Sequence, residues 1–267
     1  MLPKIIDLEP LETVVKATLY SAHVKDEKRL SLLRVAKPEC GKTAVLKKYR
    51  ENKGIVYLTD CTAYGLTRDV LPRIVSGEVH HILIADLITP LSKTSKTRQS
   101  FIAFLNNLIE EGVAKMSTYA TMWDKEAKCG LIAAVTDDEF RDGRHHWAKM
   151  GFLSRMFVFS YSYPISTVHR VFDSLLYDSS GSEEKIKLDF PEVLVDVNIP
   201  IRISKDLIPL SSQIGALMKL HGFRFFLNSK TFLKSLALIN GRRKVSRKDF
   251  EKFIELSDYF NFKFNPI

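Results

Sequence analysis

The sequence contains little cysteine and no long apolar run. Its three cysteines, Cys40, Cys61 and Cys129, are far apart and lack the spacing of metal ligands. Scattered thiols of this kind are typical of reduced proteins, so we expect a cytoplasmic location. The longest apolar stretches, such as residues 131–135, fall far short of the roughly 20 residues that span a membrane. No secretory signal is evident at the first residues, and we expect no membrane partner.

Acidic residues are in the minority. The chain of 267 residues has 31 acidic and 40 basic side chains, and its net charge is +9. An excess of positive charge favours polyanions such as DNA, RNA or an anionic surface, and an acidic protein partner is the alternative. The histidine pairs His80-His81 and His145-His146 have no cysteine or carboxylate at ligand spacing. We therefore expect these histidines at turns or on the surface.

Short apolar strands alternate with helices in the first part of the chain. This alternation predicts an α/β fold with a five-stranded parallel sheet and helices on both faces. A hairpin is expected at residues 113–122, where apolar and polar residues alternate. The expected strands are residues 30–35, 54–58, 80–86, 131–136 and 156–160, and the expected helices between them include 44–50, 67–76 and 99–112.

The pattern changes after Pro164. Residues 173–189 contain Ser-Ser-Gly-Ser-Glu-Glu and predict an exposed loop. From residue 210 onward the apolar spacing is helical, and Ser246 is a suitable N-cap for the last helix. We therefore expect two domains, an α/β domain at residues 1–164 and a small all-helical domain at residues 165–267.

The most specific motif is a candidate phosphate-binding loop. It lies between an apolar strand and a helix that begins near Ala44, and it ends in Gly-Lys-Thr. The usual pattern is Gly, four residues, then Gly-Lys-Ser/Thr, and Ala36 replaces the first glycine here. Alanine is tolerated at that position if its φ is negative. The residues of the loop are Ala36, Lys37, Pro38, Glu39, Cys40, Gly41, Lys42 and Thr43.

The chemistry of a nucleotide triphosphate explains these residue types. Lys42 supplies positive charge to the β- and γ-phosphates, and Thr43 supplies a hydroxyl to Mg²⁺. A second strand should then end in an acidic residue near the metal, and the apolar strand before Asp86 fits this requirement. The alternative is that Asp86 only caps the turn after a buried strand. ATP and Mg²⁺ are therefore the expected ligands.

Several later stretches follow in the order seen in AAA+ ATPases. The strand at residues 130–136 ends in Thr136 and resembles the sensor-1 strand. The stretch Leu-Ser-Arg that contains Arg155 resembles the segment with which minichromosome maintenance helicases and clamp loaders reach a neighbour's nucleotide. The C-terminal helices resemble the AAA+ lid, in which Arg224 is the nearest match to the second sensor and Lys230 is the runner-up.

This resemblance implies an ATPase that works as a homo-oligomer, in a ring or a helical filament. Arg155 and Thr136 would then serve catalysis together with Asp86, and Arg224 would contact the nucleotide. One departure is serious: Leu87 stands where AAA+ proteins usually have the glutamate that polarises the attacking water. Loss of general-base assistance typically costs 10²- to 10⁴-fold in rate. The carboxylates that could replace it are Glu110, Glu111, Asp137 and Asp138, and the sequence does not choose among them.

The region before the sensor strand also resembles the minichromosome maintenance family, whose hairpin carries a lysine to DNA. The matching basic residues here are Lys115, Lys125 and Lys128. A second basic run, residues 241–248, contacts nucleic acid or forms a solvated turn. We therefore expect an ATPase that assembles on DNA, as in replication, helicase loading or transposition. The alternatives are a MoxR-like chaperone that remodels a protein partner, and a nucleotide-gated scaffold with little hydrolysis.

Overall fold

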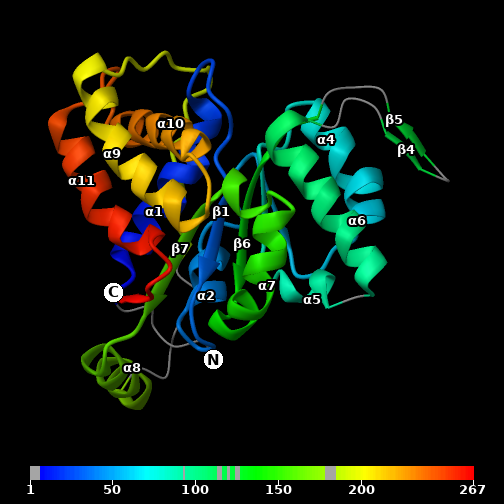
Figure 1. Cartoon of the computed structure of the whole chain (residues 1–267), viewed down its shortest axis with the longest axis horizontal. Coiled ribbons are helices and arrows are strands. Elements are labelled where there is room, and N and C mark those ends of the chain that lie inside the picture. Colours follow the sequence, from blue (N-terminus) through cyan, green and yellow to red (C-terminus); the bar gives the residue numbers. More distant parts are fainter. Residues whose placement is uncertain (1–6, 93, 113–115, 119–120, 124–126, 178–184) are drawn as a thin grey trace.

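A parallel sheet of six strands forms the centre of the molecule (Figure 1). The computed structural model describes residues 7–92, 94–112, 116–118, 121–123, 127–177 and 185–267. The prediction of a parallel α/β sheet with helices on both faces is thus confirmed. The strands lie in the order β2 (Ile55–Leu58), β3 (His81–Ile84), β6 (Gly130–Val135), β1 (Leu32–Val35), β7 (Phe157–Ser162) and β8 (Asn265–Pro266).

The expected count of five strands is wrong by one. The extra strand is β8, which pairs in parallel with the end of β7 through Tyr161–Asn265 and Ser162–Pro266. Two residues, one of them proline, carry no strand pattern of their own, and proline is tolerated only at sheet edges. This strand exists because the fold brings the C-terminal segment beside β7.

The two faces of the sheet are covered by separate sets of helices (Figure 1). Alternate residues of each strand point to opposite faces, so Leu32 belongs to one hydrophobic cluster and Leu33 to the other. The first face carries α1 (Glu9–Tyr20), α2 (Lys42–Lys47), α9 (Ile201–Leu217), α10 (Phe223–Ile239) and α11 (Arg247–Ser257). The second carries α3 (Ala63–Gly65), the π-helix η2 (Leu66–Val70), α4 (Leu71–Val75), α5 (Ile88–Leu91), α6 (Ser95–Asn106), the π-helix η3 (Asn107–Glu111) and α7 (Asp137–Lys149).

The C-terminal helices share one core with the sheet. Phe157 of β7 stacks on Phe260 at 4.8 Å and contacts Phe225 and Phe232 of α10 at 5.3 and 5.5 Å between ring centroids. Phe253 of α11 completes this aromatic cluster at 6.3 Å from Phe157. Because α10 and α11 bury their apolar sides against the sheet, the domain boundary at residue 164 stays a prediction.

Four local differences from the expected elements stand out. Residues 173–177 belong to α8 (Ile165–Tyr177), where a loop was expected, and α9 begins at residue 201 rather than 210. Helix α2 has only six residues and ends at Lys47. Short 3₁₀ turns, absent from the prediction, complete the chain at η1 (Ser21–His23), η4 (Leu153–Arg155) and η5 (Asp258–Phe260).

The expected hairpin is present. Strands β4 (Met116–Thr118) and β5 (Thr121–Trp123) pair in antiparallel fashion, and the hairpin projects from the body at the right of the view (Figure 1). Gly112, which ends η3 before the hairpin, has a φ of 84° and thus acts as the predicted stop. No helix in the described ranges is both long and apolar enough to cross a bilayer.

One member of the pair His80-His81 is not at a turn or on the surface as expected. His81 lies in β3 with 1% of its surface exposed. Its neighbour His80 packs edge-to-face against His23 at 5.5 Å, and His23 stacks on Phe190 at 4.5 Å. Burial lowers the pKa of His23 to about 4 and the pKa of His81 well below its ordinary value. Only His81 was misassigned, since His80 lies in a bend before β3. A histidine at the start of an apolar strand resembles a turn residue in sequence.

Candidate functional site

The register of the sheet gathers most of the predicted site at one edge. Val35, the last residue of β1, pairs with Val135 of β6. On the other side of β1, the preceding residue Arg34 pairs with Phe159 of β7. Strand β3 lies on the other side of β6 and runs in the same direction. The chain segments that leave β1, β3 and β6 therefore emerge together at the carboxyl edge. At this edge the strand order reverses around β1, which is where open α/β sheets bind ligands.

The loop after β1 has the backbone that the motif predicts. Gly41 has a φ of 73°, and a Cβ atom there would lie 2.8 Å from Leu8 Cδ1 and 3.2 Å from the Tyr163 hydroxyl. Only glycine fits such a position without strain. Ala36 keeps a negative φ, as the sequence required of an alanine in place of the first glycine, whereas Glu39 has a φ of 64°.

Lys42 is folded onto its own loop. Its ammonium donates to the carbonyl oxygens of Ala36 and Lys37 at 2.6 and 2.5 Å. Burial lowers the pKa of this ammonium, while the carboxylates of Asp137 and Glu139 act in the opposite direction. The lysine is thus half-buried against the carbonyl groups of its own loop.

Side chains of two neighbouring strands hold the rest of the loop through its backbone carbonyl groups. The Tyr161 hydroxyl of β7 donates to the Cys40 carbonyl at 2.6 Å, and the Arg34 guanidinium of β1 donates to the Lys42 carbonyl. Thr43 is half-buried in the first turn of α2, next to Ala44. Neither Arg34 nor Tyr161 was predicted as part of the site. The only sequence sign of Arg34 is a charged residue inside an otherwise apolar strand.

Asp86 makes the capping contact that was the alternative to a metal role. Its Oδ1 accepts a hydrogen bond from the Ile88 amide at 3.0 Å, and the side chain is exposed. The neighbouring Leu87 is fully buried and its amide donates to the Ala134 carbonyl at 2.8 Å. Position 87 therefore points into the hydrophobic core, which explains why it carries no carboxylate. Metal binding by Asp86 through water stays a prediction.

Thr136 has a structural role at the start of α7. It is the N-cap of α7: its hydroxyl accepts from the Glu139 amide at 3.3 Å, and its own amide donates to Glu139 at 2.8 Å. This reciprocal pair is a capping box. A direct role of Thr136 at the γ-phosphate stays a prediction, because its hydroxyl can still donate a hydrogen bond.

The structure distinguishes the carboxylates that could replace a glutamate at position 87. Asp137 is only 3% exposed, and its Oδ1 has no hydrogen-bond partner among the described residues. It lies two residues beyond Val135, which pairs with the last residue before the loop, and it acts electrostatically on Lys42. Arg141 pairs with both Asp137 and the exposed Asp138. Glu110 pairs with Lys28 and Arg224 instead, and nothing is described of the Glu111 side chain. Of the four candidates, Asp137 is the one whose charge acts on Lys42.

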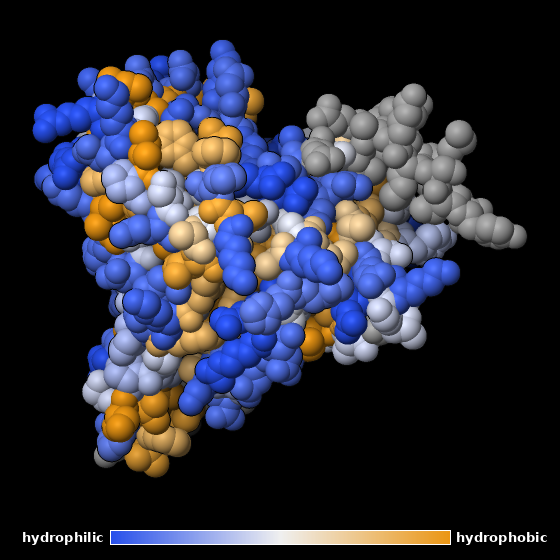
Figure 2. All heavy atoms as spheres, in the orientation of Figure 1, coloured by the Kyte–Doolittle hydropathy of each residue, from blue (hydrophilic) through white to orange (hydrophobic). Residues whose placement is uncertain are grey.

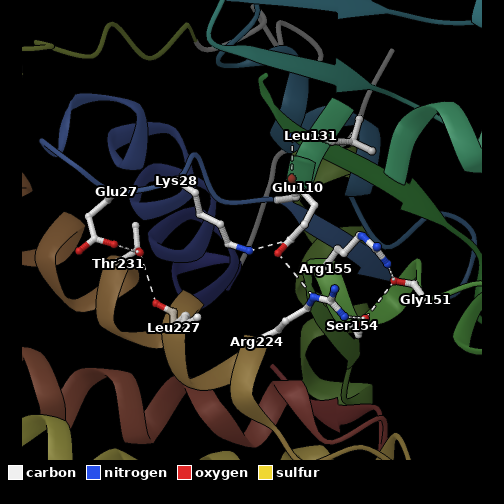
Figure 3. A network of polar contacts seen from close by, with 11 residues as sticks. Glu27, Lys28, Glu110, Leu131, Gly151, Ser154, Arg155, Arg224, Leu227 and Thr231 are labelled. Carbon is white, nitrogen blue, oxygen red and sulfur yellow. Dashed lines mark hydrogen bonds and ion pairs between the residues drawn. The ribbon is translucent and has the colours of Figure 1, made fainter. Parts of the chain in front are cut away.

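Arg155 and Arg224 meet at a second place (Figure 3). Arg155 donates to the Gly151 carbonyl at 2.7 Å, and Arg224 lies 3.5 Å from both the Ser154 hydroxyl and Glu110. Burial alone would raise the pKa of Glu110, but a 2.8 Å hydrogen bond from Lys28 and the nearby arginine charges lower it. A pocket of about 350 Å³ adjoins this network. Its lining residues include Ser154, Met156, His221, Phe223 and Arg224.

This arginine network lies at the opposite edge of the sheet from the loop. Phe157, the first residue of β7, pairs with Leu32, the first residue of β1, and Arg155 precedes it by two residues. Strand β1 has four residues and is roughly 13 Å long at about 3.3 Å per residue, and Arg155 lies two residues before the level at which it begins. The structure therefore does not bring Arg155 or Arg224 to the Lys42 of the same chain.

The predicted DNA-contacting lysines are only partly described. Lys115 and Lys125 lie outside the described residues. Lys128 is half-buried at the base of the hairpin, and its carbonyl accepts a hydrogen bond from Arg29. The hairpin itself is thus present, and its contact with DNA stays a prediction.

No protein-family model matches this sequence, and no curated protein sequence matches it significantly. Two sites remain as candidates for function: the loop at the carboxyl ends of the strands and the arginine network at their amino ends.

Proposed function

We propose that this protein is a P-loop ATPase of the AAA+ type that binds ATP and Mg²⁺ at the loop after β1. The observation that carries this proposal is the left-handed Gly41 directly before Lys42 and Thr43, at the carboxyl end of the strand where the sheet order reverses. Glycine-rich loops in this position let backbone amides approach phosphates closely.

In this proposal the loop residues have distinct roles. Lys42 exchanges its bonds to Ala36 and Lys37 for bonds to the β- and γ-phosphates. Thr43 and Asp86 hold Mg²⁺, with Asp86 acting through water. The ion supplies charge neutralisation at the phosphates when bound.

Asp137 takes the place of the missing glutamate. The carboxylate accepts the proton of the water that attacks the γ-phosphate, while the bond to ADP breaks. Support comes from the burial of this carboxylate beside the loop and from its Oδ1, which has no hydrogen-bond partner among the described residues. Its other oxygen lies 3.3 Å from the Arg141 guanidinium. A buried polar atom without a hydrogen bond is costly, and a catalytic role is one explanation for such an atom.

Arg155 and Arg224 act on the nucleotide of a neighbouring subunit. Because they lie at the amino edge and the loop lies at the carboxyl edge, a head-to-tail assembly would bring one edge against the other. Apolar side chains gather on the protrusion formed by α8 at the bottom of the view (Figure 2). Among them, Ile165, Phe172 and Leu176 are 77%, 62% and 76% exposed. Large exposed apolar patches mark interaction sites, which supports a homo-oligomer.

The test is the affinity for a labelled ATP analogue. Lys42→Ala should weaken binding by about 100-fold, because it removes a charge-assisted contact to the phosphates. The matched control is Lys53→Ala, an exposed lysine on the turn before β2. Equal affinity of wild type and Lys42→Ala would refute the proposal.

DNA is the proposed surface on which the oligomer assembles, since the net charge is +9 and the hairpin projects from the body. Binding to phosphates releases counterions, so affinity for duplex or single-stranded DNA should fall steeply between two salt concentrations. Absence of binding to either DNA at low salt would favour the protein-remodelling alternative. Buried Leu87 favours the scaffold alternative, which predicts nucleotide-dependent assembly without turnover.

A further inference from the structure

Arg34 is a fully buried cation in the strand that leads to the loop. It occupies β1 between Leu33 and Val35 and points to the opposite face, toward the cluster that contains Leu32 and Ala36. Its surface is 0% exposed. Fully buried arginines are rare unless they are paired, so its partners decide what it does.

The guanidinium of Arg34 is only partly satisfied. One nitrogen, Nη1, donates to the Lys42 carbonyl, whereas Nε and Nη2 have no hydrogen-bond partner in the described part of the chain. Burial lowers its pKa to about 10, and the phenols of Tyr161 and Tyr57 are the groups that oppose this effect. The side chain therefore remains cationic at neutral pH. No carboxylate among the described residues forms an ion pair with it.

An unpaired buried charge destabilises the protein that carries it. Replacing such a charge with an apolar side chain of similar size is often neutral or stabilising. Arg34 therefore requires an explanation outside the free energy of folding. The position of Arg34 supplies this explanation. Its guanidinium donates to the backbone carbonyl of Lys42, and its charge lowers the pKa of the Lys42 ammonium.

We propose that the buried guanidinium of Arg34 is a second phosphate-attracting charge, placed beneath the loop, which acts on bound polyphosphate through the field rather than by contact. This inference rests on the proposed nucleotide site and names a part of it that no loop motif contains. The bound phosphates supply the counter-charge that the free protein lacks. Arg34 thus lowers stability without ligand and raises affinity with it.

A field effect has a signature that a packing effect lacks. Coulomb energy is proportional to the charge of the ligand and is strong in a low-dielectric interior. The contribution of Arg34 should therefore be largest for ATP, smaller for ADP and absent for adenosine. Packing or loop geometry would alter the affinities of all three ligands together.

Three substitutions separate charge from hydrogen bonding. Arg34→Met keeps the length and removes both, Arg34→Gln keeps a donor for the Lys42 carbonyl without charge, and Arg34→Lys keeps the charge. We expect ATP affinity to fall about 10-fold in the Met and Gln variants, which corresponds to about 1.4 kcal/mol. The Lys variant should bind within about threefold of wild type. The urea midpoint of ligand-free Arg34→Met should equal or exceed that of wild type.

Calorimetric titration of each variant with ATP, ADP, adenosine and inorganic tripolyphosphate tests the inference. Equal losses for all ligands, full ATP affinity in Arg34→Met or Arg34→Gln, or strong destabilisation of every variant would each overturn it. Lys42→Ala serves as the reference: if it abolishes binding while Arg34→Met binds normally, the nucleotide site stands and this inference falls. If wild type binds no nucleotide but binds tripolyphosphate in a way that depends on Arg34, the proposed nucleotide site falls and the inference about Arg34 stands. Absence of both would overturn both.

Discussion

At the scale of single residues, two cations and one carboxylate lie near the loop. Arg34 is fully buried, Lys42 is half-buried, and Asp137 is buried with one oxygen that has no hydrogen-bond partner in the described structure. In the proposed function, the two cations attract phosphate and the carboxylate accepts a proton. Binding and turnover should therefore respond to different substitutions.

Asp137→Asn should separate turnover from binding. The amide is isosteric and cannot accept the proton of the attacking water, so the ATPase rate should fall by about 100-fold or more. Nucleotide affinity should stay within a few fold, because Lys42 is unchanged. Phosphate release and binding titrations measure the two quantities, with Asp138→Asn, an exposed neighbour, as the matched control. A rate in Asp137→Asn equal to that of Asp138→Asn would exclude the proposed role.

The buried histidines predict a loss of stability in mild acid. The pKa of His23 is about 4 in the folded protein, because burial and the neighbouring His80 disfavour its charged form. An unfolded chain takes up the proton near pH 6.5. Between these values the unfolded state binds more protons, so the free energy of unfolding falls as the pH decreases from about 6.5 toward 4.

Urea unfolding at pH 7.5, 6 and 5 checks this prediction. His23→Gln should reduce the loss by on the order of 2 kcal/mol, since each pKa unit corresponds to about 1.4 kcal/mol. His145→Gln, an exposed histidine in α7, should leave the loss unchanged. The explanation would fail if both variants lost stability with the same pH dependence as wild type.

At the scale of elements, the turn between α10 and α11 is held by an ion pair whose carboxylate is buried. Arg242 donates to both oxygens of Asp249 at 2.7 and 2.5 Å, and the amide and hydroxyl of Ser246 each donate to the same carboxylate at 2.8 Å. Arg247 pairs with Asp206 of α9. At least two members of the basic run at residues 241–248 are thus engaged within the protein, which favours a structural reading of that turn.

Asp249→Ala should therefore destabilise the C-terminal helices. The change leaves Arg242 and Ser246 without their buried acceptor, and such a loss typically costs about 1–3 kcal/mol. Chemical unfolding should show the decrease, whereas the exposed Asp258→Ala should change stability by less than about 0.5 kcal/mol. Nucleotide affinity should be unchanged in both. An Asp249→Ala protein as stable as wild type would show that the ion pair contributes nothing.

At the scale of the whole molecule, the two candidate sites lie at opposite edges of one sheet. In an assembly, one subunit could therefore present only one of the two sites to a given neighbour. In a head-to-tail assembly, a complete site then needs Lys42 from one chain and Arg155 from the next. An arginine supplied from a neighbour can be worth 10³- to 10⁵-fold in catalysis.

Mixing two inactive proteins tests this arrangement. Lys42→Ala and Arg155→Ala should each lose turnover, and a 1:1 mixture should recover activity, because about a quarter of the interfaces pair an intact Lys42 with an intact Arg155. Light scattering with ADP and with a non-hydrolysable ATP analogue measures assembly in parallel. A monomer that hydrolyses ATP as fast as any assembly, and is indifferent to Arg155, would contradict the oligomer.

Local chemistry allowed much of this protein to be predicted from sequence. The buried strands β1, β3 and β6 follow from their apolar composition, and the turn before α2 follows from Gly41, which alone fits a φ of 73°. The carboxyl-edge placement of the loop and Thr136 follows from parallel pairing. Each of these features depends on residues that are close together in the sequence or on the regular geometry of a parallel sheet. Both can be predicted from local residue types.

Only the tertiary structure decided the rest. Strand β8 exists through its pairing with β7, and Asp137 was chosen among four carboxylates by its burial beside Lys42. Arg34 became a candidate only when its guanidinium proved to be enclosed without a counter-ion. The physical reason is common to all three: burial and charge balance are set by groups distant in sequence, so the residue type alone does not determine them.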